Sequence, residues 1–253
     1  MLHVDVNADV GESFGAWSMG NDASLIPLVT SANIACGFHA GDPGVMRATV
    51  SMAREHGVAI GAHPGLPDLS GFGRRELQVT PIEVEDLVVY QIGALAGVAA
   101  AQGVKLRHVK PHGALYNMAA RDARLADAIA RGVASIDRTL VLFALSGSAL
   151  IDAGVRAGLR TASEVFGDRA YQADGTLVSR RHHAAVIHDP KTVTSRLLQM
   201  LKSGTVESID GRLIAIKAET ICVHGDTPRA VEMVRALRDA LGEAGIELRP
   251  PSE

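Results

Sequence analysis

Short apolar runs alternate with longer amphipathic stretches along almost the whole chain. Eight of the apolar runs have the length and composition of strands: Leu2–Ala8, Ala32–Phe38, Val58–Ala62, Leu106–Lys110, Leu140–Ala144, Thr161–Val165, Thr220–Val223 and Ile246–Leu248. Between them lie six helical patterns: Pro43–Gly57, a long one that opens at Thr80 and contains the apolar region Leu87–Val104, Ala123–Val133, Ser148–Ala157, Lys191–Leu201 and Pro228–Leu241. This alternation predicts a parallel α/β fold.

Two of the predicted helices carry clear boundary signals. Pro43 stands near the start of its helix and Gly57 just past the end, which is the usual placement of these residue types. Thr80 is followed three residues later by Glu83, the pattern of a capping box. Both helices are therefore predicted with defined ends.

Polar residues gather at one end of nearly every predicted strand. In (β/α) barrels the catalytic groups come from the C-terminal ends of the strands and from the loops that follow. This pattern favours a parallel (β/α) barrel of seven or eight strands over an open doubly wound sheet. No linker-like run divides the sequence, so residues 1–253 are predicted to form a single domain.

The first predicted strand has one apolar and one polar face. Successive side chains of a strand point to opposite sides, so Asp5, Asn7 and Asp9 share the face opposite Val4 and Val6. In a barrel the apolar face meets the helices and the polar face points into the lumen, where buried carboxylates need cations, hydrogen-bond donors or a ligand. The alternative is an antiparallel edge strand with one solvated face.

The other strands repeat this parity. The polar side chains on their inner faces or just beyond their ends are Asn33, His39, His63, His108, Lys110, His112, His224 and Asp226. Such a recurrence at five strand ends predicts one shared active site rather than scattered surface polarity. Asn7 and Asn33 are candidates to bind the substrate or a phosphate there.

The residue types leave two chemical roles open for this site. Asp9, Glu12, His39 and His63 are a normal ligand set for a divalent cation, with Asp9, His39 and His63 the first choice. The same side chains could act as general acids and bases without a metal. No HExxH pair is present to decide between the two roles.

Two segments offer positive charge to an anionic group. Lys110 is the best single candidate to face a phosphate or an oxyanion, the alternative being a lysine that extends from the barrel rim into solvent. The loop Gly71–Arg75 combines glycine N–H groups with Arg74 and Arg75, which could bind phosphate or carboxylate. No Walker A motif occurs, so a nucleotide would have to be bound in another way.

Neither cysteine is predicted to be a nucleophile. Cys36 has the helix-facing parity and Cys222 lies deep in an apolar strand, although on its inner face. The pair His182-His183 stands in a polar stretch and is predicted to be exposed.

Composition and charge exclude several classes of protein. The formal net charge of −3 gives no basic face for nucleic acid. Two cysteines cannot form a disulfide framework. The most apolar region, Leu87–Val104, contains two glutamines and suits a buried helix better than a membrane span. The first residues carry carboxylates where a signal peptide needs an apolar stretch, so we expect a cytoplasmic protein.

Seven motifs, taken together, resemble the LamB/YcsF family. They are Asp5–Ser13 (DVNADVGES), Ser31–Pro43, Ile60–Asp68, Gly71–Arg75 (GFGRR), Val109–Asn117 (VKPHGALYN), Ser163–Tyr171 and Cys222–Pro228 (CVHGDTP). They follow one another in family-like order and spacing over nearly the whole chain. Two positions depart from the family pattern: Ala8 stands where cysteine is frequent, and Ser179 replaces a proline before Arg180.

The resemblance implies a barrel related to the metal-dependent polysaccharide deacetylases. Characterised members of the family are the A subunits of 5-oxoprolinases, which open 5-oxoproline to L-glutamate with hydrolysis of ATP, normally with Mg²⁺. It also implies two partner subunits, B and C, which resemble the halves of a urea-amidolyase-type protein. The oligomeric state is left open, a homo-oligomer included. Carried over motif by motif, the functional positions are Asp9, Glu12, His39, Asp42, His63, Lys110, His112, Glu164, Asp168, Arg169, His224 and Asp226.

Two other functions remain to be weighed against this reading. One is a metal-dependent amide hydrolase or deacetylase that works without ATP. The other is a non-catalytic protein of the complex whose polar lumen binds a metabolite. The number of titratable groups favours an enzyme.

Overall fold

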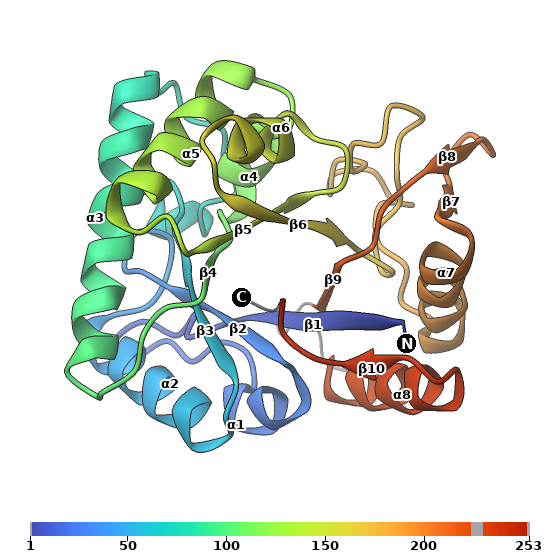
Figure 1. The fold of residues 1–253 in the computed structure, drawn as a ribbon, viewed down its shortest axis with the longest axis horizontal. Coiled ribbons are helices and arrows are strands. Elements are labelled where there is room, and N and C mark those ends of the chain that lie inside the picture. The colour runs from blue at the N-terminus through green and yellow to red at the C-terminus, as the bar shows by residue number, and fades with distance from the viewer. Residues whose placement is uncertain (1, 224–229, 252–253) are drawn as a thin grey trace.

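The computed structural model of the chain describes residues 2–223 and 230–251. Parallel strands close into a barrel, with the helices arranged around it (Figure 1). β1 pairs with β2 on one side and with β9 on the other, which closes the ring. The seven strands of the ring, in order, are β1 (His3–Val10), β2 (Ser31–Ala35), β3 (Ala59–His63), β4 (His108–Val109), β5 (Val141–Leu145), β6 (Arg160–Val165) and β9 (Thr220–Val223).

The predicted eighth strand exists but does not enter the ring. β10 (Glu247–Leu248) pairs with His3 and Val4, at the start of β1. Further along, β1 pairs with β9 instead, over Asp5–Ala8. The closed ring therefore has seven strands, and β10 pairs only with the start of β1, outside the ring.

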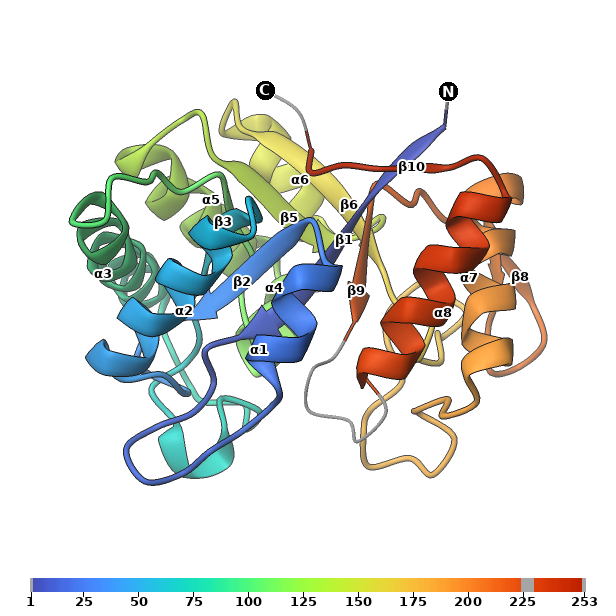
Figure 2. The ribbon, with the colours of Figure 1, turned by 90° about the horizontal axis from the view of Figure 1, so that it is seen from below.

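Helices cover the outside of the barrel. The longer ones are α2 (Pro43–Glu55), α3 (Pro81–Ala100), α5 (Ala123–Ile136), α6 (Ala149–Arg156), α7 (Pro190–Ser203) and α8 (Ala230–Glu243). Short helical turns are α1 (Asp22–Leu25), η1 (Ile26–Leu28), η2 (Leu69–Gly71) and α4 (Gly113–Ala119). α3 packs on α5, and α7 lies beside α8 (Figures 1 and 2).

The predicted boundary signals of α2 and α3 are confirmed. Thr80 accepts a hydrogen bond from the N–H of Glu83, whose carboxylate accepts one from the N–H of Thr80, so the capping box is present. α2 begins at Pro43, and Gly57 follows its end in the left-handed conformation, with φ of 67°. Glycine adopts this conformation at little cost, which explains why it stands there.

The alternation along β1 also holds. Val4, Val6 and Ala8 are fully buried against the helices, while Asp5 and Asn7 are buried on the inner face. β1 has hydrogen-bonded neighbours on both sides, so the alternative of an edge strand with a solvated face is wrong. The polar face lies in the lumen.

Some elements differ from the prediction. β2 ends at Ala35, because the chain turns at Gly37 with φ of 95°, so Phe38 and His39 lie in a loop. β4 shrinks to His108–Val109. A small antiparallel hairpin, β7 (Thr205–Glu207) with β8 (Leu213–Ala215), was not predicted. Its strands are three residues long, too short to give a periodic signal.

None of the helices in the described part of the chain is both long enough and apolar enough to cross a membrane.

The strands all point toward one end of the barrel. In Figure 2 the start of β1 and the strand β10 lie at one end, and the loops that follow β1 and β3 lie at the other. The polar residues at the strand ends therefore meet in one place, as the sequence pattern predicted.

Candidate active site

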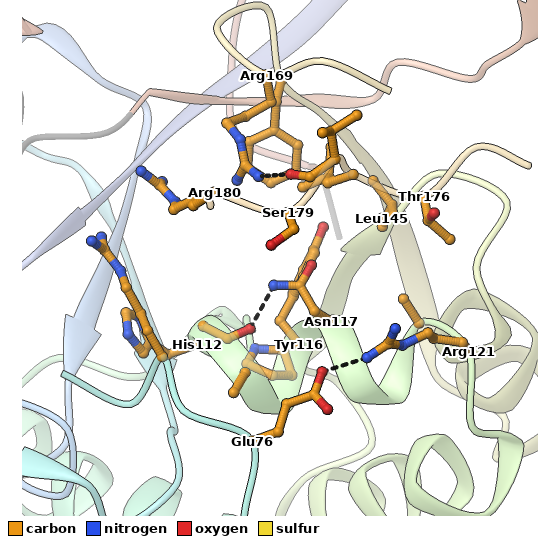
Figure 3. A pocket seen from close by; sticks show the side chains of 18 of the residues that line it. Glu76, His112, Tyr116, Asn117, Arg121, Leu145, Arg169, Thr176, Ser179 and Arg180 are labelled. Carbon is orange, nitrogen blue, oxygen red and sulfur yellow. Dashed lines mark hydrogen bonds and ion pairs between the residues drawn. The ribbon is translucent and has the colours of Figure 1, made fainter. Parts of the chain in front are cut away.

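A pocket of about 480 Å³ opens at the C-terminal end of the barrel. Figure 3 shows its walls, which come from the loop after β4, from α4 and from the long loop after β6. The side chains that bear on its chemistry are Asp9, His63, Arg74, Glu76, Lys110, His112, Tyr116, Asn117, Arg121, Arg169, Arg180 and Arg181.

Lys110 is the centre of the buried polar network at the base of this pocket. Its Nζ lies 2.9 Å from Asp9 Oδ1 and 3.0 Å from Glu164 Oε1, and it donates to Asn7 Oδ1 at 3.2 Å. Burial acts to lower the pKa of this ammonium group, but the attraction of the carboxylates of Asp9 and Glu164 outweighs burial and raises it well above its usual value. Lys110 is therefore charged and already paired with two carboxylates. The alternative that it extends into solvent is wrong, since it is only 3% exposed.

The same residue also orients His63. The Nδ1 of His63 lies 2.7 Å from the backbone oxygen of Lys110. Since a carbonyl can only accept, Nδ1 carries the hydrogen and Nε2 has the lone pair. Nε2 lies 3.3 Å from Asp9 Oδ2, and both residues line the pocket. Lys110 thus contacts two candidate general bases, Asp9 through its side chain and His63 through its backbone oxygen.

Three histidines and a glutamate form a buried cluster beside this pair. The ring of His39 stacks on that of His112 with centroids 3.7 Å apart, and the ring of His63 meets both edge-on. Glu12 Oε1 lies 3.5 Å from His39 Nε2 and 3.7 Å from His112 Nδ1. Burial, reinforced by the neighbouring histidines, lowers the pKa values of His39 and His112 well below the usual range. Both rings are therefore neutral at pH 7.

Below the site, a layer of buried polar groups completes the lumen. Asp5 Oδ1 accepts hydrogen bonds from the hydroxyls of Thr30 and Ser31, at 2.6 Å and 2.7 Å, and Oδ2 accepts one from Thr220. Burial raises the pKa of Asp5 to about 6, although these hydroxyls oppose the rise.

Asparagine side chains connect that layer to the site. Asn33 donates from Nδ2 to Asn7 Oδ1 at 2.7 Å and to Asp9 Oδ1 at 2.8 Å. Asn7 in turn donates to Glu164 Oε1 at 2.9 Å, and His108 Nε2 lies 2.8 Å from Asn33 Oδ1. Asn7, Asn33 and Glu164 are buried and do not line the pocket. They position the residues that do.

The outer wall of the pocket is strongly basic. Apart from the Lys110–Asp9 pair at the base, the charged lining residues are the cations Arg74, Arg121, Arg169, Arg180 and Arg181 and one acid, Glu76. Arg121 is paired with Glu76 at 2.5 Å. Arg169 is buried and donates to the backbone oxygens of Val178 and Ala185, and burial lowers its pKa to about 10, so it stays charged at pH 7. Such a wall suits an anionic ligand.

Several residues that were predicted to bind the substrate or a phosphate do not line the pocket. Asp42 caps α2 by accepting from the N–H groups of Gly44 and Val45, and its other oxygen accepts from Gly15. Arg75 pairs with Asp68 and does not line the pocket, in contrast to Arg74, whose guanidinium lies 4.9 Å from the Phe72 ring centroid. Asp168 is buried beside Arg169 but also lies outside the lining. His224 and Asp226 fall outside the described residues.

The two cysteines are buried, as predicted, and remain thiols. Burial raises the pKa of Cys36 to about 12 and that of Cys222 well above its usual value. Cys222 Sγ nevertheless lies 3.0 Å from Lys110 Nζ, on the inner face that its strand parity indicated. His182 and His183 are exposed, also as predicted.

Six of the lining side chains that bear on the pocket's chemistry were not predicted from the sequence: Glu76, Tyr116, Asn117, Arg121, Arg180 and Arg181. Tyr116 donates its hydroxyl to Glu164 Oε2 at 2.7 Å. It belongs to the motif that contains Lys110 and His112, and its position one turn into α4 was the available signal. Arg180 and Arg181 stand in a polar stretch with no periodicity, and only the path of the long loop after β6 brings them to the pocket. Figure 3 shows Arg180 there.

Comparison with known proteins agrees with the motifs. The model of the LamB/YcsF family matches residues 4–253. The chain belongs to this family. Among its relatives is a protein of Bordetella pertussis named as the A subunit of 5-oxoprolinase, 57% identical over 246 residues, which span 97% of this chain and 98% of the relative.

Solved structures support the same assignment. A lactam utilization protein from Thermus thermophilus is 49% identical and superimposes with a TM-score of 0.92, over 98% of this chain and 99% of that one. The catalytic domain of a peptidoglycan N-acetylglucosamine deacetylase from Eubacterium rectale is 9% identical, with a TM-score of 0.52 over 98% and 88% of the two chains. The second comparison concerns the fold alone, and it confirms the predicted likeness to deacetylase barrels.

Proposed function

We propose that this chain is the A subunit of an ATP-dependent 5-oxoprolinase, which opens 5-oxoproline to L-glutamate while ATP is hydrolysed to ADP and phosphate. Relatives that align over nearly their full length carry this name. The observation that carries the proposal in the structure is the basic pocket directly above the Asp9–His63 pair. It combines a place for anionic groups with candidate bases.

The chemistry of the substrate explains the need for ATP. A five-membered lactam is a stable amide that water attacks poorly. Transfer of the γ-phosphoryl group of ATP to the lactam oxygen would make the ring carbon electrophilic and turn that oxygen into part of a leaving group. Mg²⁺ accompanies the nucleotide as its usual counterion.

The residues divide between two tasks in this mechanism. Arg169, which is buried and held by two backbone oxygens, would stabilise the phosphoryl group in transfer, since preorganised cations act most strongly away from water. Arg180, which is exposed, would help to bind the phosphates. Asp9 or His63 would take a proton from the water that attacks the ring carbon. Collapse of the tetrahedral adduct expels the protonated ring amine and leaves an acyl phosphate. A second water then attacks the acyl carbon of that intermediate, and the C–O bond breaks, so phosphate departs with the former lactam oxygen. Lys110 keeps Asp9 ionised and in place.

The chain would act as part of a larger enzyme. We propose 5-oxoprolinase subunits B and C as its partners, in keeping with the naming of its relatives as A subunits, and the cytoplasm as its location, where ATP is available. A homo-oligomer of this chain within the complex is compatible with the proposal.

An isotope experiment tests the phosphorylation step. The assembled enzyme would be supplied with 5-oxoproline labelled with ¹⁸O in the ring carbonyl, and the released phosphate would be analysed by mass spectrometry. One ¹⁸O atom per phosphate is expected, because the lactam oxygen leaves with phosphorus. Glutamate formed with all ¹⁸O retained in its side-chain carboxylate and none in phosphate would contradict the mechanism. Ring opening without ATP would instead favour the metal-dependent amide hydrolase.

A further inference from the structure

The lone pairs of two buried histidines face each other beside the pocket. His112 Nε2 lies 2.8 Å from the backbone oxygen of Phe72, so it carries the hydrogen and Nδ1 has the lone pair. His63 presents the lone pair of Nε2, because its Nδ1 donates to the backbone oxygen of Lys110. These two acceptor nitrogens are only 3.0 Å apart. Two acceptors at this distance repel unless a cation lies between them.

The third histidine of the cluster, His39, is also buried, without a hydrogen bond in the described part of the chain that would stabilise it. Neither ring nitrogen of His39 has a hydrogen bond within the described residues, although the ring is fully buried. Its Nε2 instead faces Glu12 Oε1 at 3.5 Å. Burying an imidazole in this way is costly unless something binds it.

We propose that Glu12, His39, His63 and His112 form a binding site for one divalent transition-metal ion. The four donor atoms lie within 4.8 Å of one another. Ligand atoms about 2.0 Å from a tetrahedral ion are about 3.3 Å apart, and the separations of 3.0 Å, 3.5 Å and 3.7 Å within the cluster bracket that value. Three imidazoles and one carboxylate suit Zn²⁺ and its neighbours such as Co²⁺, whereas Mg²⁺ prefers oxygen ligands alone.

The surroundings support this site in two ways. The carbonyls of Lys110 and Phe72 fix the tautomers of His63 and His112, as outer groups do around metal-bound histidines. The ring of His39 has room only because Gly65 lies beside it, since a Cβ there would stand 2.6 Å from His39 Nδ1. The stacked rings of His39 and His112 cannot both aim at one ion in their own planes, so binding requires His39 to tilt. Neither ring nitrogen of His39 has a hydrogen bond in the described structure, so this ring can tilt without breaking one.

A shared proton is the alternative cation. A proton on His63 Nε2 would satisfy Asp9 Oδ2 or His112 Nδ1. It would leave the buried nitrogens of His39 unexplained, whereas one metal ion accounts for all three imidazoles. An ion there would adjoin Asp9 and the pocket, where it could lower the pKa of a bound water or polarise a carbonyl. The inference stands without the proposed function, because its test measures binding and not turnover.

The test is a metal titration of the purified full chain. The protein is stripped with a chelator and titrated with Zn²⁺ by calorimetry, and with Co²⁺ by visible absorption, which reports a site of nitrogen and oxygen ligands of low coordination number. One equivalent of tight binding is expected. Glu12→Gln and His39→Asn should each weaken it about tenfold or more, and His63→Asn should weaken it further.

Two histidines serve as matched controls. His183→Asn removes an exposed imidazole, and His108→Asn removes a buried one whose Nε2 contacts Asn33 outside the cluster. Both should keep wild-type affinity for Zn²⁺.

Glu12→Gln and His39→Asn test the metal site even if His63→Asn fails to fold. Glu12→Gln keeps the size and shape of the side chain, and His39→Asn removes ring nitrogens that have no hydrogen bond within the described residues. Less than about a tenth of an equivalent bound to the wild type, or unchanged affinity in both of these variants, would overturn the proposal.

Discussion

Lys110 and Asp9 form a buried ion pair, 2.9 Å between Nζ and Oδ1, at the base of a basic pocket. Lys110 also pairs with Glu164 and accepts from His63 through its backbone oxygen. One residue thereby places a positive charge beside Asp9 and fixes the tautomer of His63. Lys110 therefore contacts both candidate bases, and because it also lines the pocket it stays a candidate to face a phosphate.

Removing this charge should damage both stability and activity. Lys110→Met takes their shared cation away from the buried carboxylates of Asp9 and Glu164, so we expect the free energy of unfolding to fall by about 3–5 kcal/mol and turnover of the assembled enzyme to be lost. Adding Glu164→Gln removes one of these two negative charges and should recover part of the stability but not the activity. Denaturant unfolding and an activity assay measure the two effects. Lys105→Met, at an exposed lysine, is the control, and near-normal turnover of Lys110→Met would remove Lys110 from the mechanism.

The basic wall of the pocket should govern affinity for ATP. Arg180→Ala removes a cation from the lining, and we expect the KM for ATP of the assembled enzyme to rise about tenfold or more, the usual value of a charge-assisted hydrogen bond. Arg47→Ala, at an exposed arginine of α2, should leave the KM unchanged. If both variants behave alike, the phosphates bind elsewhere, for example at a surface of another protein of the complex.

Asp5 should make stability depend on pH. Its pKa is raised to about 6 in the folded state, mainly by burial, from a usual value of 3.8. The folded state therefore binds the proton more tightly, so this contribution is fully present below about pH 4 and is lost as the pH rises through about 6. It amounts to about 3 kcal/mol.

A variant isolates this contribution. The unfolding free energy of the wild type minus that of Asp5→Asn should fall by about 3 kcal/mol between about pH 4 and pH 8. Asp86→Asn, at an exposed carboxylate, is the control for loss of a surface carboxyl group. A difference between wild type and Asp5→Asn that stays constant with pH would show that Asp5 titrates normally in the folded protein.

The packing around the histidines depends on a glycine. At Gly73, φ is 61° and a Cβ would lie 2.7 Å from His39 Cβ and 2.9 Å from His112 Cδ2. Gly73→Ala should therefore shift both rings and lower the free energy of unfolding by about 1–3 kcal/mol. Gly93→Ala, in α3 with nothing within 4 Å of the added atom, should instead stabilise the protein by about 0.5–1 kcal/mol. Equal thermal shifts for the two variants would contradict the described packing.

The alternation of apolar and polar residues along β1 was the most informative pattern in the sequence. Because side chains alternate along a strand, the inward direction of Asp5, Asn7 and Asp9 followed from the pattern alone. The cap of α3 at Thr80 was also readable, since both of its partners lie within one turn. These features depend on local geometry, which the sequence records directly.

Features that depend on contacts distant in sequence were harder to predict. Glu164 meets Lys110 only when the barrel closes, and a lysine paired with two acids looks in sequence like one that is free to bind phosphate. Arg75 and Arg74 are neighbours in the chain, but only Arg74 reaches the pocket, because Asp68 binds Arg75. Arg180 enters the site through a loop without periodicity. In each case the three-dimensional partner decides the role.

The most direct test of the proposed function is reconstitution of the whole reaction. This chain would be mixed with candidate subunits B and C, ATP, Mg²⁺ and 5-oxoproline, and glutamate and phosphate would be followed together. We predict equal release of both products, which stops when this chain is omitted and is not restored by Lys110→Met. Failure of a folded, assembled complex to form glutamate, or full activity without this chain, would contradict its assignment to the 5-oxoprolinase complex.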